Sequence, residues 1–111
     1  METGSMISQM TVQEFSEVLQ KMGPRDLVLD IREPDEFADG HIPGARNLPM
    51  GMVPGHIDEL KGFDHVYLIC ARGNRTRRLH AAIESHLSNL VCLANFGMMA
   101  WTDSGYPTER P

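Results

Sequence analysis

The spacing of apolar residues along the chain predicts two amphipathic helices. In residues 12–22 and 76–87 the apolar residues recur every three or four positions, which places them on one face of a helix. Thr11 and Glu14 have the spacing of a capping box at the start of the first helix, and a Gly-Pro pair ends it. Shorter patterns of the same kind predict further helical turns at 33–38, 56–60 and 98–103.

Three short aliphatic runs predict buried strands, at residues 26–31, 66–69 and 90–93. Residues 33–54 hold many prolines and glycines, so beyond a first helical turn we expect an ordered loop there. The predicted strands alternate with the predicted helices. This order is typical of an α/β fold in which helices cover both faces of a parallel sheet.

The length and composition fit one soluble domain. The chain has 111 residues, of which 41% are hydrophobic, and its longest apolar run, 66–71, is too short to cross a membrane. The net charge of -5 argues against a nucleic-acid partner. Residues 1–6 contain Gly-Ser before a second Met and no signal-peptide pattern, so we expect a cloning remnant or a disordered tail ahead of a single domain at 7–111. With two cysteines in all, a reducing, cytoplasmic location is expected.

One junction between a strand and a helix carries candidate chemistry. The strand 66–69 runs directly into Cys70, and a turn containing Gly73 leads to the next helix. In α/β sheets, ligands bind at the carboxyl ends of strands against helix N-termini, where backbone N–H groups form a nest for anions. The helix dipole and nearby arginines favour a thiolate at Cys70. Four of the ten basic residues crowd this junction: Arg72, Arg75, Arg77 and Arg78.

A structural role is the alternative for each cysteine. Cys70 could simply end a buried strand, since cysteine often serves as a small apolar residue. Cys92 lies in mid-strand between apolar neighbours, with no charge or nest near it in sequence, and we expect it to be structural and inert. A disulfide between the two is not expected in a reducing compartment. The histidines at 56, 65, 80 and 86 have no ligand spacing with either cysteine, so no metal site is expected.

Four short motifs stand in a fixed order between residues 29 and 107. They are LDIR at 29–32 with Glu36-Phe37, GHIPGA at 40–45 with Asn47, CARGNRT at 70–76, and GMMAW at 97–101 with GYP at 105–107. Together they resemble the signatures of the single-domain rhodanese family of sulfurtransferases, in which the third motif is the active-site loop. One departure is Phe96, where the family usually has the first glycine of a pair, and it bears on the local loop conformation.

The resemblance implies a rhodanese-like fold with a central, mostly parallel five-stranded sheet. It also implies that Cys70 takes a sulfane sulfur from a small anionic donor such as thiosulfate. The resulting persulfide would pass to a thiophilic acceptor, which is cyanide, a small thiol or a protein thiol, and no cofactor or metal would be needed. The loop residues that would hold the persulfide are Ala71, Arg72, Gly73, Asn74, Arg75 and Thr76.

The length of the loop bears on which chemistry the resemblance implies. Related phosphatases of the cell-cycle type, and similar arsenate reductases, place five residues between Cys and Arg, a ring wide enough for a tetrahedral oxyanion. Cys70 and Arg75 have four residues between them, so the ring resembles the sulfur-handling class and phosphatase activity is disfavoured. Two alternatives stay open: a persulfide carrier in a sulfur relay with low activity on free thiosulfate, and a non-catalytic regulatory module. The intact cysteine counts against the second.

Several residues outside the loop are expected to support it. Asp30 ends a strand and is expected to brace the loop through a hydrogen bond, and an ion pair is expected between Arg32 and Glu36. Within the loop, Arg72 is expected to face the mouth of the site and attract an anionic donor, while Arg75 holds the shape of the ring.

Two further groups of residues are expected to be structural. His41 stands in a turn rich in glycine and proline, which favours a structural role. Met98, Met99 and Trp101 are expected to pack the final helix onto the sheet. The alternative for the methionines is an exposed surface that contacts a partner.

Overall fold

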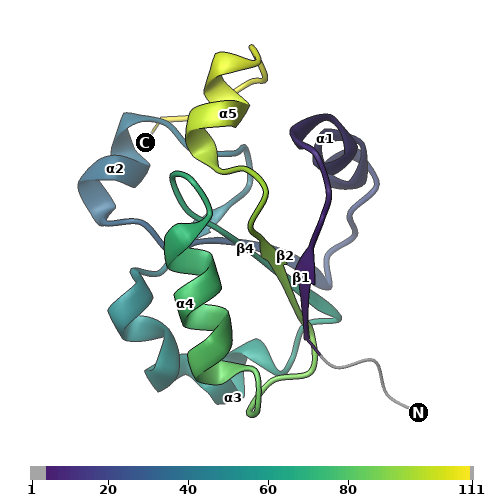
Figure 1. The fold of residues 1–111 in the computed structure, drawn as a ribbon, viewed down its shortest axis with the longest axis vertical. Helices are drawn as coiled ribbons and strands as arrows, with labels where there is room; N and C mark the ends of the chain where they lie inside the picture. Colours follow the sequence, from purple (N-terminus) through teal and green to yellow (C-terminus); the bar gives the residue numbers. More distant parts are fainter. Residues whose placement is uncertain (1–4, 111) are drawn as a thin grey trace.

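The computed structural model describes residues 5–110, which form a single sheet with helices around it (Figure 1). Residues 1–4 of the expected N-terminal tail lie outside the described residues. The strands are β1 (Met6–Ser8), β2 (Asp26–Asp30), β3 (Arg46–Asn47), β4 (His65–Ile69) and β5 (Leu90–Leu93). The helices are α1 (Val12–Gln20), α2 (Pro34–Asp39), the 3-10 helix η1 (Met50–His56), α3 (Ile57–Leu60), α4 (Asn74–Ile83) and α5 (Met98–Asp103).

The sheet has five strands in the order β1-β5-β4-β2-β3, and every neighbouring pair is parallel. The prediction of a mostly parallel five-stranded sheet is therefore confirmed. Because all strands run the same way, their carboxyl ends meet along one edge of the sheet. The central strand β4 ends there, and Cys70 follows directly after it.

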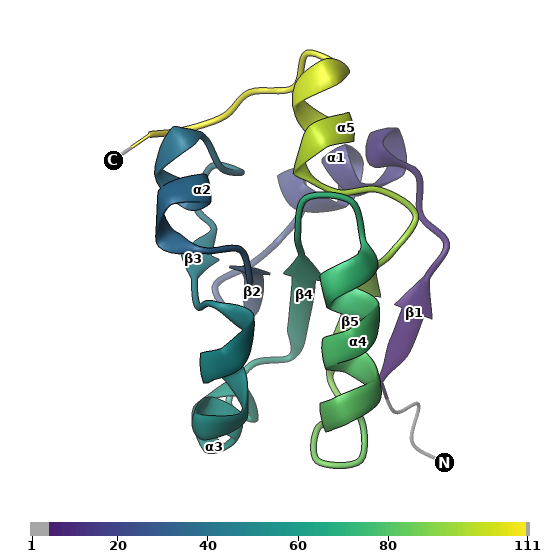
Figure 2. The ribbon, with the colours of Figure 1, turned by 60° about the vertical axis from the view of Figure 1, so that its left-hand side comes forward.

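Helices cover both faces of the sheet, as the alternation of strands and helices predicts. On one face, Leu79 and Ile83 of α4 pack with Leu60 of α3 and with η1 against β2 and β4. On the other face, Phe15 of α1 and Trp101 of α5 pack against the opposite side of the same strands. Figure 2 shows α4 in front of the strands and α1 behind them. The sheet is thus buried on both sides, which explains why the central strands are almost purely aliphatic.

The structure contains elements that the hydrophobic pattern did not predict. The strand β1 has only three residues, and its Met6 and Ile7 are exposed, so no alternating pattern marks it. It crosses the expected boundary between residues 6 and 7. The strand β3 has two residues and lies within the region expected to be a loop.

Helix boundaries also differ from the expected ones. The capping box of Thr11 and Glu14 is present, and α1 ends at Gln20, two residues before the expected end. The helix α4 covers 74–83 rather than 76–87. Leu87, the last residue expected in this helix, lies after the helix ends and is buried in the core. Its apolar side chain fits the helical spacing, which is why the pattern predicts a longer helix. Across residues 5–110, no helix has the length and apolar character that a membrane span requires.

Candidate active site

The candidate nucleophile is Cys70, which follows the carboxyl end of the central strand β4. Only 1% of its surface is exposed, so its sulfur faces the protein rather than bulk solvent. The backbone N–H of Gly73 donates a hydrogen bond of 3.1 Å to Cys70 Sγ. A donor aimed at the sulfur stabilises a negative charge there, which is the electrostatic requirement of a nucleophilic thiolate.

The turn from Cys70 leads into α4 through a glycine at the N-cap, which makes no side-chain cap hydrogen bond. Gly73 is the N-cap of α4 and has a φ of +99°, a backbone conformation that residues with a side chain rarely adopt. A Cβ at this position would also lie 2.4 Å from the carbonyl oxygen of Ala94. Since glycine brings no capping side chain, the first N–H groups of α4 keep no side-chain partner. The exposed Asn74 opens this helix.

Thr76 ties the loop to the neighbouring strand. Its hydroxyl is fully buried and lies 2.8 Å from the carbonyl oxygen of Gly73 and 3.0 Å from that of Leu93, so it can donate to either. The same oxygen is 3.9 Å from Cys70 Sγ. Thr76 therefore links the loop, the end of β5 and the sulfur through one side chain.

The start of α5 holds the loop from the other side. The backbone N–H of Met98 donates to the carbonyl of Cys70 (2.8 Å), and that of Met99 donates to the carbonyl of Ala71 (3.1 Å). This approach is so close that a Cβ on Gly97 would lie 2.4 Å from the carbonyl oxygens of both Cys70 and Ala71. The glycine at 97 is thus required by contact with the active-site loop, although its φ of -154° is ordinary extended backbone.

Arg75 is bound by a carboxylate from α2. Its two terminal nitrogens donate to the two carboxylate oxygens of Glu36 at 2.8 and 2.9 Å. This hydrogen-bonded pair lowers the pKa of Glu36 from 4.5 to about 2 and raises the pKa of Arg75. A forked pair of this kind fixes the guanidinium in one orientation, so Arg75 links the start of α4 to α2.

The expected ion pair between Arg32 and Glu36 is wrong, because each has a different partner. Arg32 donates from its backbone N–H, Nε and Nη2 to the carboxylate of Asp30, which is fully buried. Its Nη2 also donates to the carbonyl of Gly40. Asn47 then donates to the carbonyls of Asp30 and Arg32. Asp30 and Arg32 therefore brace the backbone that follows β2, beside the loop.

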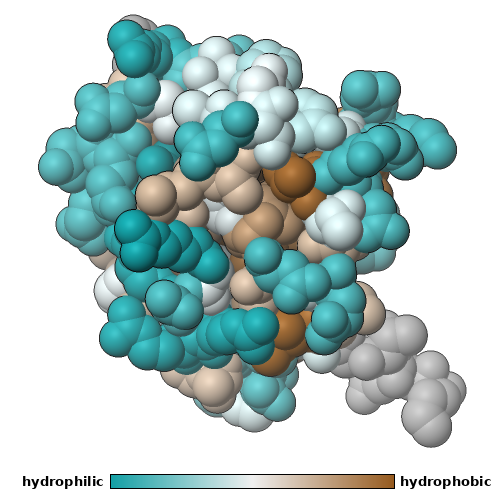
Figure 3. Space-filling model, turned by 45° about the horizontal axis from the view of Figure 1, so that its top comes forward, coloured by the Kyte–Doolittle hydropathy of each residue, from teal (hydrophilic) through white to brown (hydrophobic). Residues whose placement is uncertain are grey.

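Arg72 and Met99 form the exposed rim of the site. Arg72 lies on the loop with its side chain exposed, and its Nε is 2.9 Å from Met99 Sδ. Met98 and Trp101 pack onto the sheet as predicted, whereas Met99 does not, because 47% of it is exposed. Figure 3 shows the face that carries α5, where hydrophobic side chains gather in the middle and hydrophilic ones surround them.

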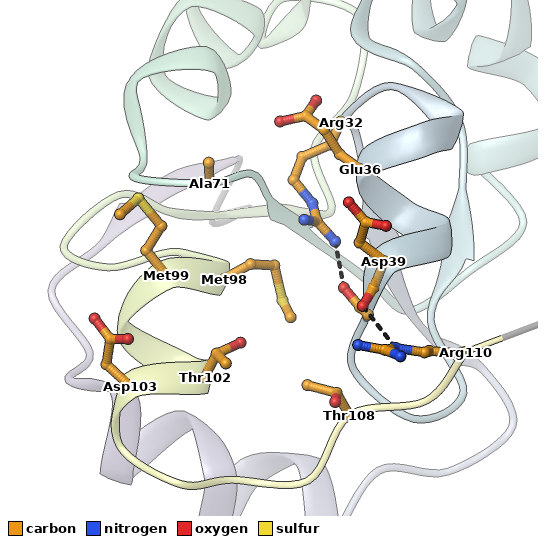
Figure 4. Close-up of a pocket in the computed structure, with 11 residues that line it drawn as sticks. Arg32, Glu36, Asp39, Ala71, Met98, Met99, Thr102, Asp103, Thr108 and Arg110 are labelled. Carbon is orange, nitrogen blue, oxygen red and sulfur yellow. Dashed lines mark hydrogen bonds between the residues drawn. The ribbon is translucent and has the colours of Figure 1, made fainter.

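A groove of about 470 Å³ opens beside the loop, between α2, α5 and the segment 106–110 (Figure 4). Ala71, the residue after Cys70, lines it together with Met98, so the groove begins next to the candidate nucleophile. Thr108 and Arg110 line its outer wall. Sequence reasoning missed this groove, because no local pattern shows that residues near 110 meet those near 39.

The remaining candidates, Cys92 and His41, lie outside the loop 70–76. Cys92 is buried in β5, and burial raises the pKa of its thiol. His41 stacks on Phe37, and its Nδ1 lies 2.9 Å from the carbonyl oxygen of Phe37. Within residues 5–110, no three His, Cys, Asp or Glu side chains come together in an arrangement that could hold a metal ion.

Comparison with known proteins agrees with the motifs. The family model described as "Rhodanese-like domain" matches residues 11–104. A protein named "Sulfurtransferase" from Allochromatium vinosum is 33% identical over 85 residues, which are 77% of this chain and 79% of the relative. The "Putative sulfur carrier protein YrkF" of Bacillus subtilis is 29% identical over 101 residues. The match covers 91% of this chain and 54% of the length of YrkF.

The fold is similar to that of solved structures with the same domain. A rhodanese-like domain protein from Staphylococcus aureus superimposes with a TM-score of 0.80 at 29% identity. The match covers 96% of this chain and 99% of that one.

Proposed function

The chain belongs to the rhodanese-like domain family, and from this premise we propose that it is a sulfurtransferase that works through a persulfide on Cys70. The observation that carries the proposal is the hydrogen bond from the Gly73 N–H to Cys70 Sγ, beside the uncapped first turn of α4. This arrangement favours negative charge on the sulfur. It favours a thiolate before the reaction and a persulfide anion after it.

Thiosulfate is the donor that we propose as a probe. The Cys70 thiolate attacks the outer sulfur of thiosulfate, and the bond between the two donor sulfurs breaks with its electron pair leaving on sulfite. The product is a Cys70 persulfide, with no net oxidant or reductant. The exposed guanidinium of Arg72 supports this role, since it places a positive charge where a dianionic donor would arrive.

The second half of the cycle returns Cys70 to its starting state. A thiophilic acceptor, cyanide or a thiolate, attacks the outer sulfur of the persulfide. The S–S bond breaks, and its electron pair stays on Cys70 as a thiolate. The Gly73 N–H already lies at 3.1 Å from that atom, so the leaving thiolate is stabilised without rearrangement of the loop.

The size of the loop supports sulfur chemistry over phosphate chemistry. Arg75, which would close a phosphatase-type ring, has four residues between it and Cys70 and is held by Glu36 in a forked ion pair. Two of its five N–H donors are therefore committed to Glu36, and the fork holds the guanidinium in an orientation set by α2.

A persulfide carrier is the second candidate. It is favoured by the similarity to YrkF, whose name describes a sulfur carrier protein and of whose length this chain spans 54%. A carrier would accept sulfur at Cys70 in the same way. It would then release the sulfur to a partner protein rather than turn over with free thiosulfate and cyanide.

Mass spectrometry after incubation with thiosulfate, or with an inorganic polysulfide, tests the proposal. We expect the wild type and Cys92→Ser to gain one sulfur atom, mapped to the peptide that contains Cys70, and Cys70→Ser to gain none. Steady turnover of thiosulfate with cyanide would identify an enzyme, and loading from polysulfide without turnover would identify a carrier. No sulfur on Cys70 from either donor would overturn the proposal.

A further inference from the structure

The groove beside Cys70 has an outer wall that the family match does not include. The match ends at residue 104, whereas the wall is formed by the segment 106–110. His41 and Glu109 exchange two backbone hydrogen bonds of 2.8 and 3.0 Å, and Trp101 Nε1 donates to the carbonyl of Pro107. The segment is thus bound to both sides of the groove.

The charges that line the groove are only partly used by the protein itself. Arg32 is neutralised by Asp30, and Glu36 by Arg75. Arg110 uses its Nε to donate to the carbonyl of Asp39, and among residues 5–110 its two terminal nitrogens have no partner. Within the same described part, the carboxylate of Asp39 makes no hydrogen bond or ion pair.

Both residues line the same groove, and the hydrogen bond from Arg110 Nε to the carbonyl of Asp39 places them on the same side of it. Figure 4 shows Asp39 and Arg110 on the same side of the groove, with the side chain of Met98 between them and α5. Asp103, another acidic residue that lines the groove, points away from Arg110 in this view. Among residues 5–110, α2 and the segment 106–110 thus offer one carboxylate and one guanidinium without an ion-pair partner, in the same groove that Ala71, the residue after Cys70, lines from the other side.

We propose that this groove binds a small acceptor thiol that carries an α-amino-acid group, with its carboxylate on Arg110 and its ammonium on Asp39. A thiol that carries only a carboxylate would give Asp39 no positively charged partner. A thiol that carries only an ammonium would give Arg110 no negatively charged partner. A volume of about 470 Å³ lies within the range of small-molecule sites.

The inference rests on the proposed function, because the bound thiol is the attacking group in the second half of the cycle. Its thiolate attacks the outer sulfur of the Cys70 persulfide, and the S–S bond breaks with its electron pair on Cys70. The acceptor leaves as a persulfide. Atoms and electrons balance without any further reagent.

Kinetics with four thiols on the persulfide-loaded protein test the inference. The thiols are L-cysteine, 3-mercaptopropionate, cysteamine and 2-mercaptoethanol, compared at equal thiolate concentration. We expect the lowest KM for cysteine. Arg110→Gln should raise the KM for cysteine and 3-mercaptopropionate about tenfold, the size of one charge-assisted hydrogen bond, and leave cysteamine unchanged. Asp39→Asn should raise the KM for cysteine and cysteamine and leave 3-mercaptopropionate unchanged.

Lys21→Gln is the matched control, since it removes one positive charge from an exposed position at the end of α1 that does not line the groove. Equal KM values for the four thiols, or equal effects of Arg110→Gln on all of them, would overturn the inference while sulfur loading on Cys70 remained. Failure of Cys70 to load would instead overturn the proposed function. Arg110→Lys keeps the positive charge and should have a higher affinity for cysteine than Arg110→Gln. If Arg110→Gln acted only by displacing the segment 106–110, the lysine would not restore this affinity.

Discussion

Replacement of Gly97 by alanine tests whether the start of α5 sets the position of the active-site loop. The backbone of Gly97 is extended, so alanine suffers no conformational strain there. Its Cβ, however, would lie 2.4 Å from the carbonyl oxygens of Cys70 and Ala71. Both carbonyls accept hydrogen bonds from the next two residues of α5, so the clash falls on the contact that holds the loop.

The size of the effect follows from the geometry. An ordinary contact begins at 3.4 Å, so the loop and the start of α5 must separate by about 1 Å. We expect a loss of stability of about 1–3 kcal/mol, the usual cost of overpacking. A displacement of about 1 Å at a reacting group reduces the rate about 100-fold, so sulfur transfer should fall by about that factor.

The assay is transfer of sulfur from thiosulfate to cyanide, at a temperature at which circular dichroism shows the variant to be folded. Gly55→Ala is the control, because a Cβ at that position would meet nothing within 4 Å. A folded Gly97→Ala protein with the activity of Gly55→Ala would refute the reasoning, since the loop would then tolerate the shift.

Three further predictions follow from the ion pair, the rim and the two thiols. Because the pKa of Glu36 is lowered to about 2, its pair with Arg75 stabilises the fold above pH 4.5 and is lost as the pH falls towards 2. Glu36→Gln should therefore lower the free energy of unfolding, measured with urea, by about 1 kcal/mol at neutral pH. This value is small because both side chains of the pair are partly exposed to solvent. Near pH 2 the substitution should have no effect. Arg72→Ala should raise the KM for thiosulfate, weaken its salt dependence and change stability by less than about 0.5 kcal/mol. Iodoacetamide should label Cys70 before Cys92, whose pKa is raised by burial, as peptide mapping would show.

Each of these three has an outcome that contradicts it. An effect of Glu36→Gln that is the same at every pH would show that the charge on Glu36 contributes nothing. Loss of folding in Arg72→Ala, with KM unchanged, would assign that arginine to structure. Equal labelling of the two cysteines in the native protein would remove the argument that the loop activates Cys70.

Local patterns in the sequence predict the centre of the fold and the place of the candidate nucleophile. The aliphatic runs at β2, β4 and β5 mark strands that are buried on both faces, and Cys70 follows the middle one. The edge strands β1 and β3 could not be predicted in this way, because β1 has three residues and β3 has two, too few to show a periodicity.

The partners of the charged residues could not be predicted from local spacing. Arg32 and Glu36 stand four residues apart, which suggests a pair, yet Glu36 binds Arg75, a residue 39 positions later. This contact depends on how α2 and α4 meet at the edge of the sheet, and no short-range pattern encodes that meeting. The same holds for the groove, whose walls come from residues near 39 and near 110.

The hydrogen bonds from α5 to the loop have a consequence for the newly made chain. Cys70 leaves the ribosome well before Met98 and Met99 do, and until they dock, the carbonyls of Cys70 and Ala71 lack the two hydrogen bonds from α5. A nascent chain, or one cleaved ahead of α5, therefore lacks this attachment of the loop that contains Cys70. Under the proposed function, the reactivity of Cys70 towards sulfur donors is expected to depend on the docking of α5, and so on completion of folding.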